Sequence, residues 1–212
     1  MGSKVATCRE KTAKIKIKTK GIYPRIFILS GPGGAGKTTL LNRLFHKKFV
    51  QDNFLRTVSV TTRAMRKGEN EAKDYFFLKQ EEFLWLEKKG FFLETQKVLS
   101  DFYGTPAPFL KEAKRMNKDL ILCIDVKGGE YLKNKFKKNR IISVFITAPN
   151  EKELYSRLKK RKEAKPQIEE RVKLAKKELQ FSKYYDYLIV NKRIKESLGR
   201  LEEILKKERG DK

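Results

Sequence analysis

The stretch Arg25–Thr38 (RIFILSGPGGAGKT) joins a short apolar run to a glycine-rich segment. Its first part, Arg25–Ser30, is almost continuously apolar, which is typical of a strand buried on both faces of a parallel sheet. Its second part, Gly31–Thr38, fits the pattern G-x-x-x-x-G-K-[ST]. Because glycine has no Cβ, successive backbone N–H groups of such a segment can converge on a phosphate. The stretch therefore predicts a strand, a phosphate-binding loop and a helix that begins at Lys37.

The loop indicates a site for a nucleoside triphosphate. We expect Lys37 to reach the β- and γ-phosphate oxygens and the Thr38 hydroxyl to complete the shell of a Mg²⁺ ion. The start of the helix adds its dipole to the attraction for phosphate. ATP is thus the expected phosphoryl donor and Mg²⁺ the expected cofactor. The candidate ATP-binding residues here are Gly31, Pro32, Gly33, Gly34, Ala35, Gly36, Lys37, Thr38 and Thr39.

Further apolar runs extend this pattern into a fold. Asp119–Asp125, Ile141–Thr147 and Tyr187–Val190 also read as buried strands. Residues with helical spacing separate them, namely Leu40, Leu41, Leu44 and Phe45, then Leu154 and Leu158, then Ile168, Val172, Ala175 and Leu179, and finally Ile194, Leu198, Leu201 and Leu205. Alternating strands and helices predict an α/β fold with a P-loop NTPase-type parallel sheet flanked by helices.

The domain organisation follows from where this alternation is interrupted. One domain is expected over residues 21–212, with its core at 21–56 and 107–212. Residues 57–106 contain short alternating pieces and turn signals, which predict a smaller inserted lobe of mixed α/β structure. Residues 1–20 carry seven basic side chains and one acid, and we expect a flexible basic arm there.

Composition excludes several classes of protein. The chain has 212 residues and two cysteines, Cys8 and Cys123, so a disulfide framework is excluded, and with a single histidine a Cys/His zinc site is not expected. No apolar run approaches the length of a membrane span and no secretory signal follows Met1, which favours the cytoplasm. The formal net charge of +25 attracts polyanions in general, but no aromatic–basic motif indicates specific nucleic-acid binding.

The inserted lobe contains residue types suited to a second phosphate. In Ser59–Glu69 (SVTTRAMRKGE), Arg63 and Arg66 lie three positions apart, and paired guanidinium groups can bind a phosphate monoester through two parallel hydrogen bonds. Three short motifs follow, namely Asp74–Phe77 (DYFF), Phe92–Glu94 (FLE) and Phe102–Thr105 (FYGT).

Together with the loop, these motifs strongly resemble the guanylate kinase family. The signature of that family reads roughly S-x-T-T-R-x-x-R-x-G-E, then D-Y-x-F, F-x-E and Y-Y-G-[ST]. The resemblance continues through Ile121–Gly128, Ile146–Pro149 and Tyr185–Asn191, and so covers about residues 24–208. It implies an enzyme that transfers the γ-phosphoryl group of MgATP to GMP and also to dGMP, with residues 57–106 as the GMP-binding lobe and a helical lid at about 157–171.

The resemblance also implies a role for each matching residue. Arg63 and Arg66, with the hydroxyl groups of Tyr75 and Tyr103, would hold the GMP phosphate. Glu94 and Asp125 would accept hydrogen bonds from N1–H and the exocyclic amine of guanine, because ionised carboxylates only accept. Ser59 and Thr105 would donate to O6. The complete implied GMP-binding set is Ser59, Arg63, Arg66, Glu69, Tyr75, Glu94, Tyr103, Gly104, Thr105 and Asp125.

The lid is implied to neutralise charge in the transition state. Arg157, Arg161 and Arg171 would close over the triphosphate, so that the catalytic set comprises these three with Lys37 and Arg63. Asn191 is implied to line the adenine pocket.

Three positions depart from the family pattern. Cys123 stands where an acid usually begins a D-[IV]-D motif, Lys162 follows the lid arginine in place of glycine, and Gly33 replaces a common serine in the loop. An acidic contribution near Mg²⁺ is therefore missing or supplied by another residue.

Two other functions stay open at this point. A related kinase could phosphorylate another monoester such as a ribosyl bisphosphate, although this would leave Glu94 and Asp125 without a guanine partner. A guanylate kinase-like domain could also serve as a phosphopeptide-binding module without catalysis. Expected partners are the small molecules ATP and GMP, without a membrane span, and the sequence is compatible with either a monomer or a homodimer.

Overall fold

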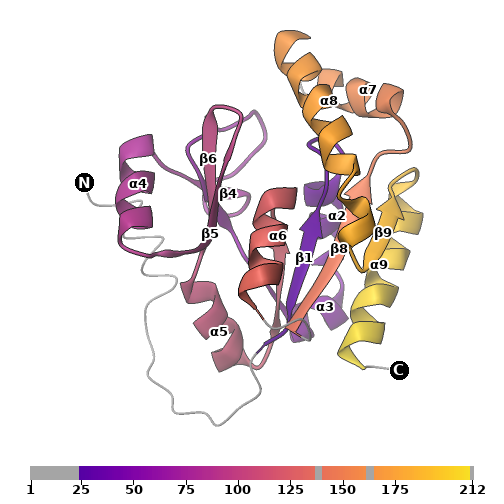
Figure 1. Ribbon diagram of the computed structural model, residues 1–212. Helices are drawn as coiled ribbons and strands as arrows, with labels where there is room; N and C mark the ends of the chain where they lie inside the picture. Colours follow the sequence, from indigo (N-terminus) through magenta and orange to yellow (C-terminus); the bar gives the residue numbers. More distant parts are fainter. Residues whose placement is uncertain (1–23, 137–139, 161–164, 211–212) are drawn as a thin grey trace. The chain divides into compact units, whose positions relative to one another are not determined.

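A computed structural model describes residues 24–136, 140–160 and 165–210, so the basic arm predicted at 1–20 lies outside the described residues. Strands and helices alternate along most of the chain (Figure 1). The strands are β1 (Ile26–Ser30), β2 (Phe54–Arg56), β3 (Ser59–Thr61), β4 (Tyr75–Phe77), β5 (Phe92–Val98), β6 (Asp101–Pro106), β7 (Asp119–Cys123), β8 (Ile141–Thr147) and β9 (Tyr187–Val190). The helices are α2 (Lys37–Leu44), α3 (Lys48–Asn53), α4 (Gln80–Lys88), α5 (Pro108–Met116), α6 (Val126–Lys135), α7 (Glu151–Lys160), α8 (Lys165–Leu179), α9 (Ile194–Arg209) and the short 3₁₀ helix η2 (Ser182–Tyr184).

The larger sheet confirms the predicted fold class. Its strand order is β2-β7-β1-β8-β9, and β2 pairs in parallel with β7 as β8 does with β9. Every residue of β1 is buried, as are all but the last residues of β7 and β8, which is why their sequences are apolar throughout rather than alternating. The four strands predicted from apolar runs are all present, and β7 ends at Cys123, two residues before the predicted end.

The smaller sheet is mixed and lies within the segment predicted as an inserted lobe. Its order is β4-β3-β6-β5, with β3 parallel to β4 and antiparallel to β6, and with β5 antiparallel to β6. The register places Glu94 of β5 opposite Thr105 of β6, and Ser59 of β3 opposite Tyr75 of β4. This pairing collects polar side chains from separate sequence motifs onto neighbouring strands.

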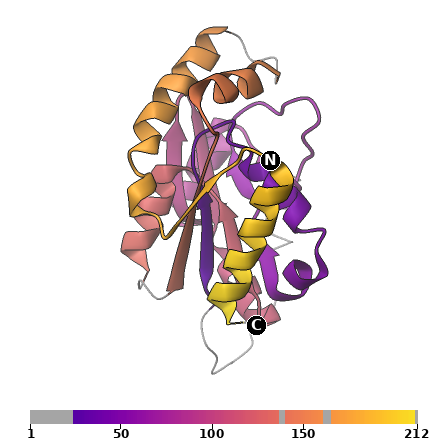
Figure 2. The ribbon, with the colours of Figure 1, turned by 90° about the vertical axis from the view of Figure 1, so that its right-hand side faces the viewer.

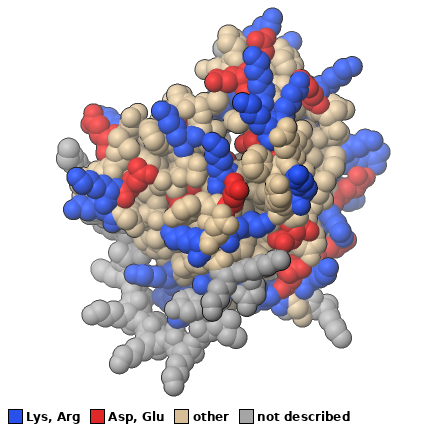
Figure 3. Space-filling model, viewed as in Figure 1, with Lys and Arg blue, Asp and Glu red and all other residues tan. Residues whose placement is uncertain are grey.

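The chain divides into two compact units. The phosphate-loop unit comprises residues 27–52 and 123–129 and the described residues from 142 onward; the mixed-sheet unit comprises residues 53–122 and the described residues of 1–26 and 130–141. Basic side chains are spread over the face drawn in Figure 3. Among the described helices, none combines the length and the apolar character that crossing a membrane requires.

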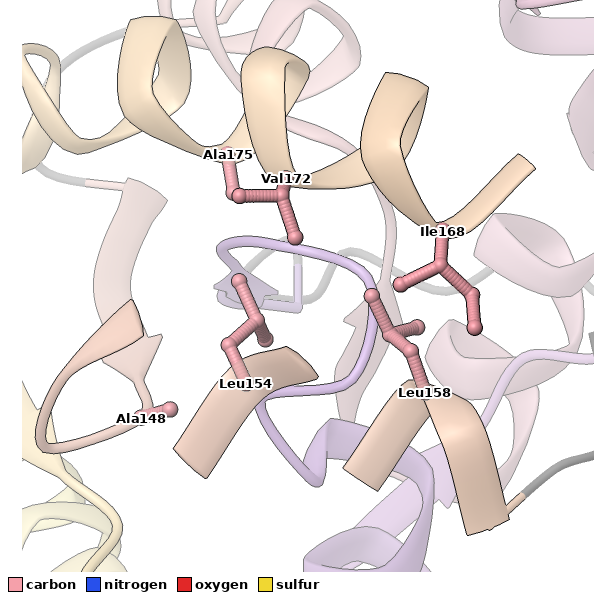
Figure 4. Packing of buried hydrophobic residues seen from close by; sticks show 6 residues of the cluster. All are labelled: Ala148, Leu154, Leu158, Ile168, Val172 and Ala175. Carbon is pink, nitrogen blue, oxygen red and sulfur yellow. The ribbon is translucent and has the colours of Figure 1, made fainter. Parts of the chain in front are cut away.

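Helices α7 and α8 pack together within the phosphate-loop unit (Figure 2). Their contact belongs to a small apolar cluster of six side chains (Figure 4), namely Ala148 before α7, Leu154 and Leu158 of α7, and Ile168, Val172 and Ala175 of α8. Helical spacing predicted Leu179 on the same face of α8, and this prediction is wrong, because Leu179 is 41% exposed. At this end of α8 the partly buried residue is instead Glu178.

Truncation of Leu158 tests whether this cluster holds the two helices. The side chain is fully buried, so Leu158→Ala is expected to lower the free energy of unfolding by about 2–5 kcal/mol through lost burial and a residual cavity. Leu179→Ala, the exposed control on α8, should change it by about 0.5 kcal/mol or less. Urea denaturation followed by circular dichroism measures both, and equal losses would contradict the assigned packing.

Candidate active site

The glycines of the loop lie where neighbouring groups leave no room for side chains. A Cβ on Gly31 would fall 2.0 Å from the carbonyl oxygen of Ile146 in β8, and one on Gly36 would fall 2.4 Å from Nδ2 of Asn191. Both glycines also have positive φ, at 132° and 96°, a region that L-residues rarely adopt. The loop conformation therefore depends on glycine at these two positions.

Lys37 begins α2, as predicted, and its side chain folds back along the loop. Its Nζ donates to the carbonyl oxygens of Gly31 and, at 3.0 Å, of Pro32. The ammonium group is thus held over the loop by backbone acceptors.

Two side chains from distant parts of the sequence support the loop at Ala35. Nδ2 of Asn191, which is 3% exposed, donates to the carbonyl oxygen of Ala35 at 2.8 Å. Arg157 of α7 donates to the same carbonyl at 3.4 Å and to the carbonyl of Asn191 at 2.8 Å. Because these donors satisfy loop carbonyls, they fix the backbone. The predicted contacts of Asn191 with adenine and of Arg157 with the triphosphate stay predictions.

A further lid arginine lies against the loop. Nη1 of Arg171 in α8 is 3.2 Å from where a Cβ on Gly33 would stand, so glycine at that position leaves space for the guanidinium group. Arg161, the third predicted lid arginine, lies outside the described residues.

Asp125 follows β7 and caps helix α6. Its Oδ1 accepts the backbone N–H of Gly128 at 2.7 Å, while its carbonyl accepts the hydroxyl of Ser30 at 3.1 Å. Burial raises the pKa of Asp125, although the Gly128 hydrogen bond and the charge of Lys37 act in the opposite direction. The cap fixes the carboxylate at the carboxyl end of the sheet, where ligands of such folds bind.

In the mixed-sheet unit, Arg63 is paired with Glu69. Nη2 of Arg63 donates to both carboxylate oxygens, at 2.8 and 3.0 Å, and the Arg66 backbone N–H donates to Oε2 at 2.8 Å. Burial pushes the pKa of Glu69 upward, but these hydrogen bonds outweigh it and hold that pKa below its usual range. The same pairing raises the pKa of Arg63 despite the opposing effect of burial.

Aromatic rings surround this guanidinium group. Arg63 lies 5.5 Å from the ring centre of Tyr75 and 5.7 Å from that of Phe77, distances suited to cation–π attraction. The rings of Tyr75 and Tyr103 meet edge to face at 6.1 Å. The structure thus gathers Arg63, Glu69, Tyr75 and Tyr103, which the sequence places up to forty positions apart.

Glu94 and Thr105 form a second polar pair on this sheet. The Thr105 hydroxyl donates to Oε1 of Glu94 at 2.7 Å, and both residues are buried, at 0% and 5% exposure. A buried carboxylate is costly without donors, so this hydrogen bond stabilises Glu94 and orients it. Ser59 is also buried, and a Cβ on Gly104 would lie 2.8 Å from the ring of Phe92.

One charged residue near the loop is missing from the sequence prediction. Glu178 of α8 interacts electrostatically with Lys37, Asp125 and Arg171. Glu178 and Leu179 lie three and four positions after Ala175, and residues at both spacings are neighbours on a helix surface. Spacing alone therefore does not distinguish them, and the apolar Leu179 was predicted to face the core.

The loop fits the Mg²⁺ ion that the fold implies. Mg²⁺ prefers hard oxygen ligands and is bound by few protein groups together with substrate phosphates. The Thr38 hydroxyl in the first turn of α2 is such a group. Within the described ranges, no three histidine, cysteine or acidic side chains gather into a metal site.

A phosphate loop that opens a helix at the end of a parallel strand, with a lysine and two arginines directed at it, defines a P-loop nucleotide-binding protein. A sequence model of the family described as Guanylate kinase matches residues 23–208. The chain therefore belongs to the guanylate kinase family.

Individual relatives agree with this assignment. The guanylate kinase of Wolbachia pipientis wMel is 39% identical over 194 residues, which cover 91% of this chain and 93% of that protein. That of Anaplasma phagocytophilum (strain HZ) is 38% identical over 193 residues, covering 91% and 89%. A crystal structure of guanylate kinase from Anaplasma phagocytophilum matches with a TM-score of 0.71 at 34% identity, covering 88% of this chain and 86% of that one.

The Arg63–Glu69 pair gives the mixed-sheet unit a dependence on pH. A lowered pKa in the folded state means that Glu69 stabilises the fold above the ordinary pKa of a glutamate and loses this effect as the pH falls through its lowered value. Glu69→Gln is expected to cost about 1–3 kcal/mol of unfolding free energy at neutral pH.

Denaturant unfolding at a series of pH values measures this cost. The difference between wild type and Glu69→Gln should shrink as the pH drops below the ordinary glutamate range, whereas the exposed control Glu81→Gln should stay close to wild type. A difference that does not change with pH would show that the carboxylate charge plays no part.

Proposed function

We propose that this chain transfers the γ-phosphoryl group of MgATP to GMP, giving ADP and GDP. The observation that carries the proposal is the presence, in a chain of the guanylate kinase family, of an intact phosphate loop and of a buried, oriented Glu94 on the mixed sheet. Membership of the family and the relatives of that name support an enzyme.

The triphosphate would bind at the loop between β1 and α2. Backbone N–H groups of residues 33–38, after Pro32, would face its phosphates, and Lys37 would exchange its two carbonyl partners for the β- and γ-oxygens. Thr38 would hold the Mg²⁺ ion, which neutralises phosphate charge and orients the γ-phosphoryl group when bound. Asn191 and Arg157 would keep the loop backbone in the binding conformation.

The acceptor would bind on the mixed sheet. Arg63 and Arg66, with the hydroxyls of Tyr75 and Tyr103, would hold its phosphate, and the existing Arg63–Glu69 pair aligns the guanidinium group beforehand. Such alignment lowers the entropy cost of binding. Glu94 would accept hydrogen bonds from the guanine edge, with Asp125 as the second acceptor and Ser59 and Thr105 as donors to O6.

Discrimination between purines would rest on these carboxylates. Guanine presents N1–H and an exocyclic amine side by side, whereas adenine presents an acceptor at N1. A bound adenine would leave the Glu94 carboxylate facing the lone pair of N1. The loss of binding free energy would then be several-fold larger than for a missing apolar contact. Phosphoryl transfer itself needs positioning and positive charge, which Lys37, Arg171 and Arg157 would supply at the loop.

A neutral substitution at Glu94 tests the acceptor site. Glu94→Gln keeps the size of the side chain but presents an amide to guanine, so kcat/KM for GMP is expected to fall roughly 10- to 100-fold with little change in KM for ATP. A coupled assay for ADP release measures both constants. Glu81→Gln, an exposed acid in the same unit, serves as the matched control.

The same assay separates the alternatives. Wild-type turnover of a ribosyl bisphosphate but not of GMP would support a different kinase, and GMP binding without turnover of any acceptor would support a binding module. If Glu94→Gln matched wild type with GMP, the role of Glu94 in reading guanine would be wrong.

A further inference from the structure

The first turn of helix α6 contains two glycines at positions where other residues would favour the helix. The helix begins directly after Asp125, and Gly128 and Gly129 are its third and fourth residues. Glycine is among the least favourable residues inside a helix, and where it occurs there it usually has a packing reason. The surroundings of Gly129 supply such a reason.

Two polar side chains from other parts of the phosphate-loop unit approach Gly129 closely. A Cβ at this position would lie 2.8 Å from the hydroxyl oxygen of Tyr185 and 3.1 Å from Oγ of Ser30. Ser30 is fully buried at the end of β1. The ring of Tyr185 meets that of Phe145 edge to face, with 5.2 Å between the ring centres, and its hydroxyl oxygen is buried. A side chain at position 129 would therefore displace these groups or the helix itself.

Gly129 and Ser30 are also hydrogen-bonded to Asp125. The carbonyl oxygen of Asp125 accepts the Ser30 hydroxyl at 3.1 Å and the backbone N–H of Gly129 at 3.0 Å. Its carboxylate accepts the backbone N–H of Gly128 through Oδ1 at 2.7 Å. Because the start of α6 holds both the backbone and one carboxylate oxygen of Asp125, a shift of this turn would also turn the carboxylate.

Inosine monophosphate (IMP) is a ligand that can report on the direction of this carboxylate. Its base keeps N1–H and O6 of guanine but lacks the exocyclic amine. A hydrogen bond from that amine to a carboxylate weakens steeply when the distance and angle depart from their preferred values. A displaced acceptor would therefore favour GMP over IMP less strongly than a well-placed one does.

We propose that Gly129 is a positioning residue. Because it carries no side chain, Ser30 and Tyr185 pack against the first turn of α6, and this packing holds Asp125 in the direction that discriminates GMP from IMP. The proposal rests on the proposed function in one respect, namely that Asp125 accepts a hydrogen bond from the exocyclic amine of guanine. It adds to that function three residues that act through Asp125.

The binding constants of GMP and IMP test the proposal. Isothermal titration calorimetry gives the Kd of each ligand, and the ratio of the two constants measures the preference for GMP. Gly129→Ala is expected to lower this preference about fivefold to tenfold, mainly by weakening the binding of GMP. Gly199→Ala is the matched control, because it adds the same methyl group to helix α9 where the described part of the chain leaves open space around a Cβ. It should keep the wild-type preference.

A double variant shows whether Gly129 acts through Asp125. Asp125→Asn weakens the acceptor but keeps a side chain that can cap the helix, and it should lower the preference for GMP by itself. Adding Gly129→Ala to Asp125→Asn should lower it by clearly less than Gly129→Ala does in wild type, since both changes affect one interaction. Losses that simply add, or a preference unchanged in Asp125→Asn, would overturn the proposal.

Ser30→Ala gives a second, milder test of the same support. It removes only the hydroxyl that bonds to the Asp125 carbonyl, so the preference for GMP should fall in the same direction by a smaller factor. This variant decides the question if Gly129→Ala does not fold, which thermal unfolding of each variant shows.

The outcomes separate the two proposals. Equal weakening of GMP and IMP, or an unchanged preference in both Gly129→Ala and Ser30→Ala, would overturn the role of Gly129 even if wild type phosphorylates GMP. Wild type that prefers GMP in binding but phosphorylates no acceptor would overturn the proposed function, while the preference would still decide the role of Gly129. Wild type that binds GMP and IMP equally would overturn the assigned contact of Asp125 with the amine, and with it the role of Gly129.

Discussion

The absence of space around the loop glycines is the constraint on which the phosphate-loop unit depends. Gly31 lies against the backbone of β8 and Gly36 against the amide of Asn191, and each has a positive φ that other residues adopt only with strain. Strand β8, the residue after β9, and helices α7 and α8 each bring a group to this loop. The parallel sheet thus serves mainly to hold a backbone cradle in one conformation, which is what electrostatic stabilisation of phosphates requires.

Charges in both units are paired with groups of the protein. Arg63 is bound by Glu69, and Lys37 by two loop carbonyls, with Asp125 and Glu178 as nearby acids. Unpaired buried cations would be costly, so such internal partners stabilise the fold while keeping the side chains aligned. In the proposed function, a bound phosphate would replace these partners, and the affinity of each site would reflect the difference between two sets of interactions.

Much of the fold follows from sequence pattern, because buried parallel strands are apolar throughout and the loop has a distinctive composition. Strands β1, β8 and β9 and the start of α2 were predicted to within a residue. Short elements such as β2 and α3 were not, since three to six residues carry too little periodicity. On α8, spacing predicted Leu179 on the buried face, but Leu179 is exposed, because the positions three and four after Ala175 are equally close to it on the helix surface and spacing alone does not distinguish them.

Prediction of the candidate site from sequence patterns is limited in the same way. Motifs identified the residue types, but the support of Ala35 by Asn191 and Arg157 joins positions more than a hundred residues apart and leaves no local signal. Likewise, Thr105 was assigned a contact with guanine, and its hydrogen bond to Glu94 emerges only from the strand register.

Phosphorus NMR of the wild-type protein with MgATP and an equimolar mixture of GMP and AMP tests directly whether the chain phosphorylates GMP and rejects AMP. The GMP signal is expected to be replaced by the two signals of GDP while AMP persists. Comparable loss of AMP, or release of inorganic phosphate from ATP with GMP unchanged, would contradict it.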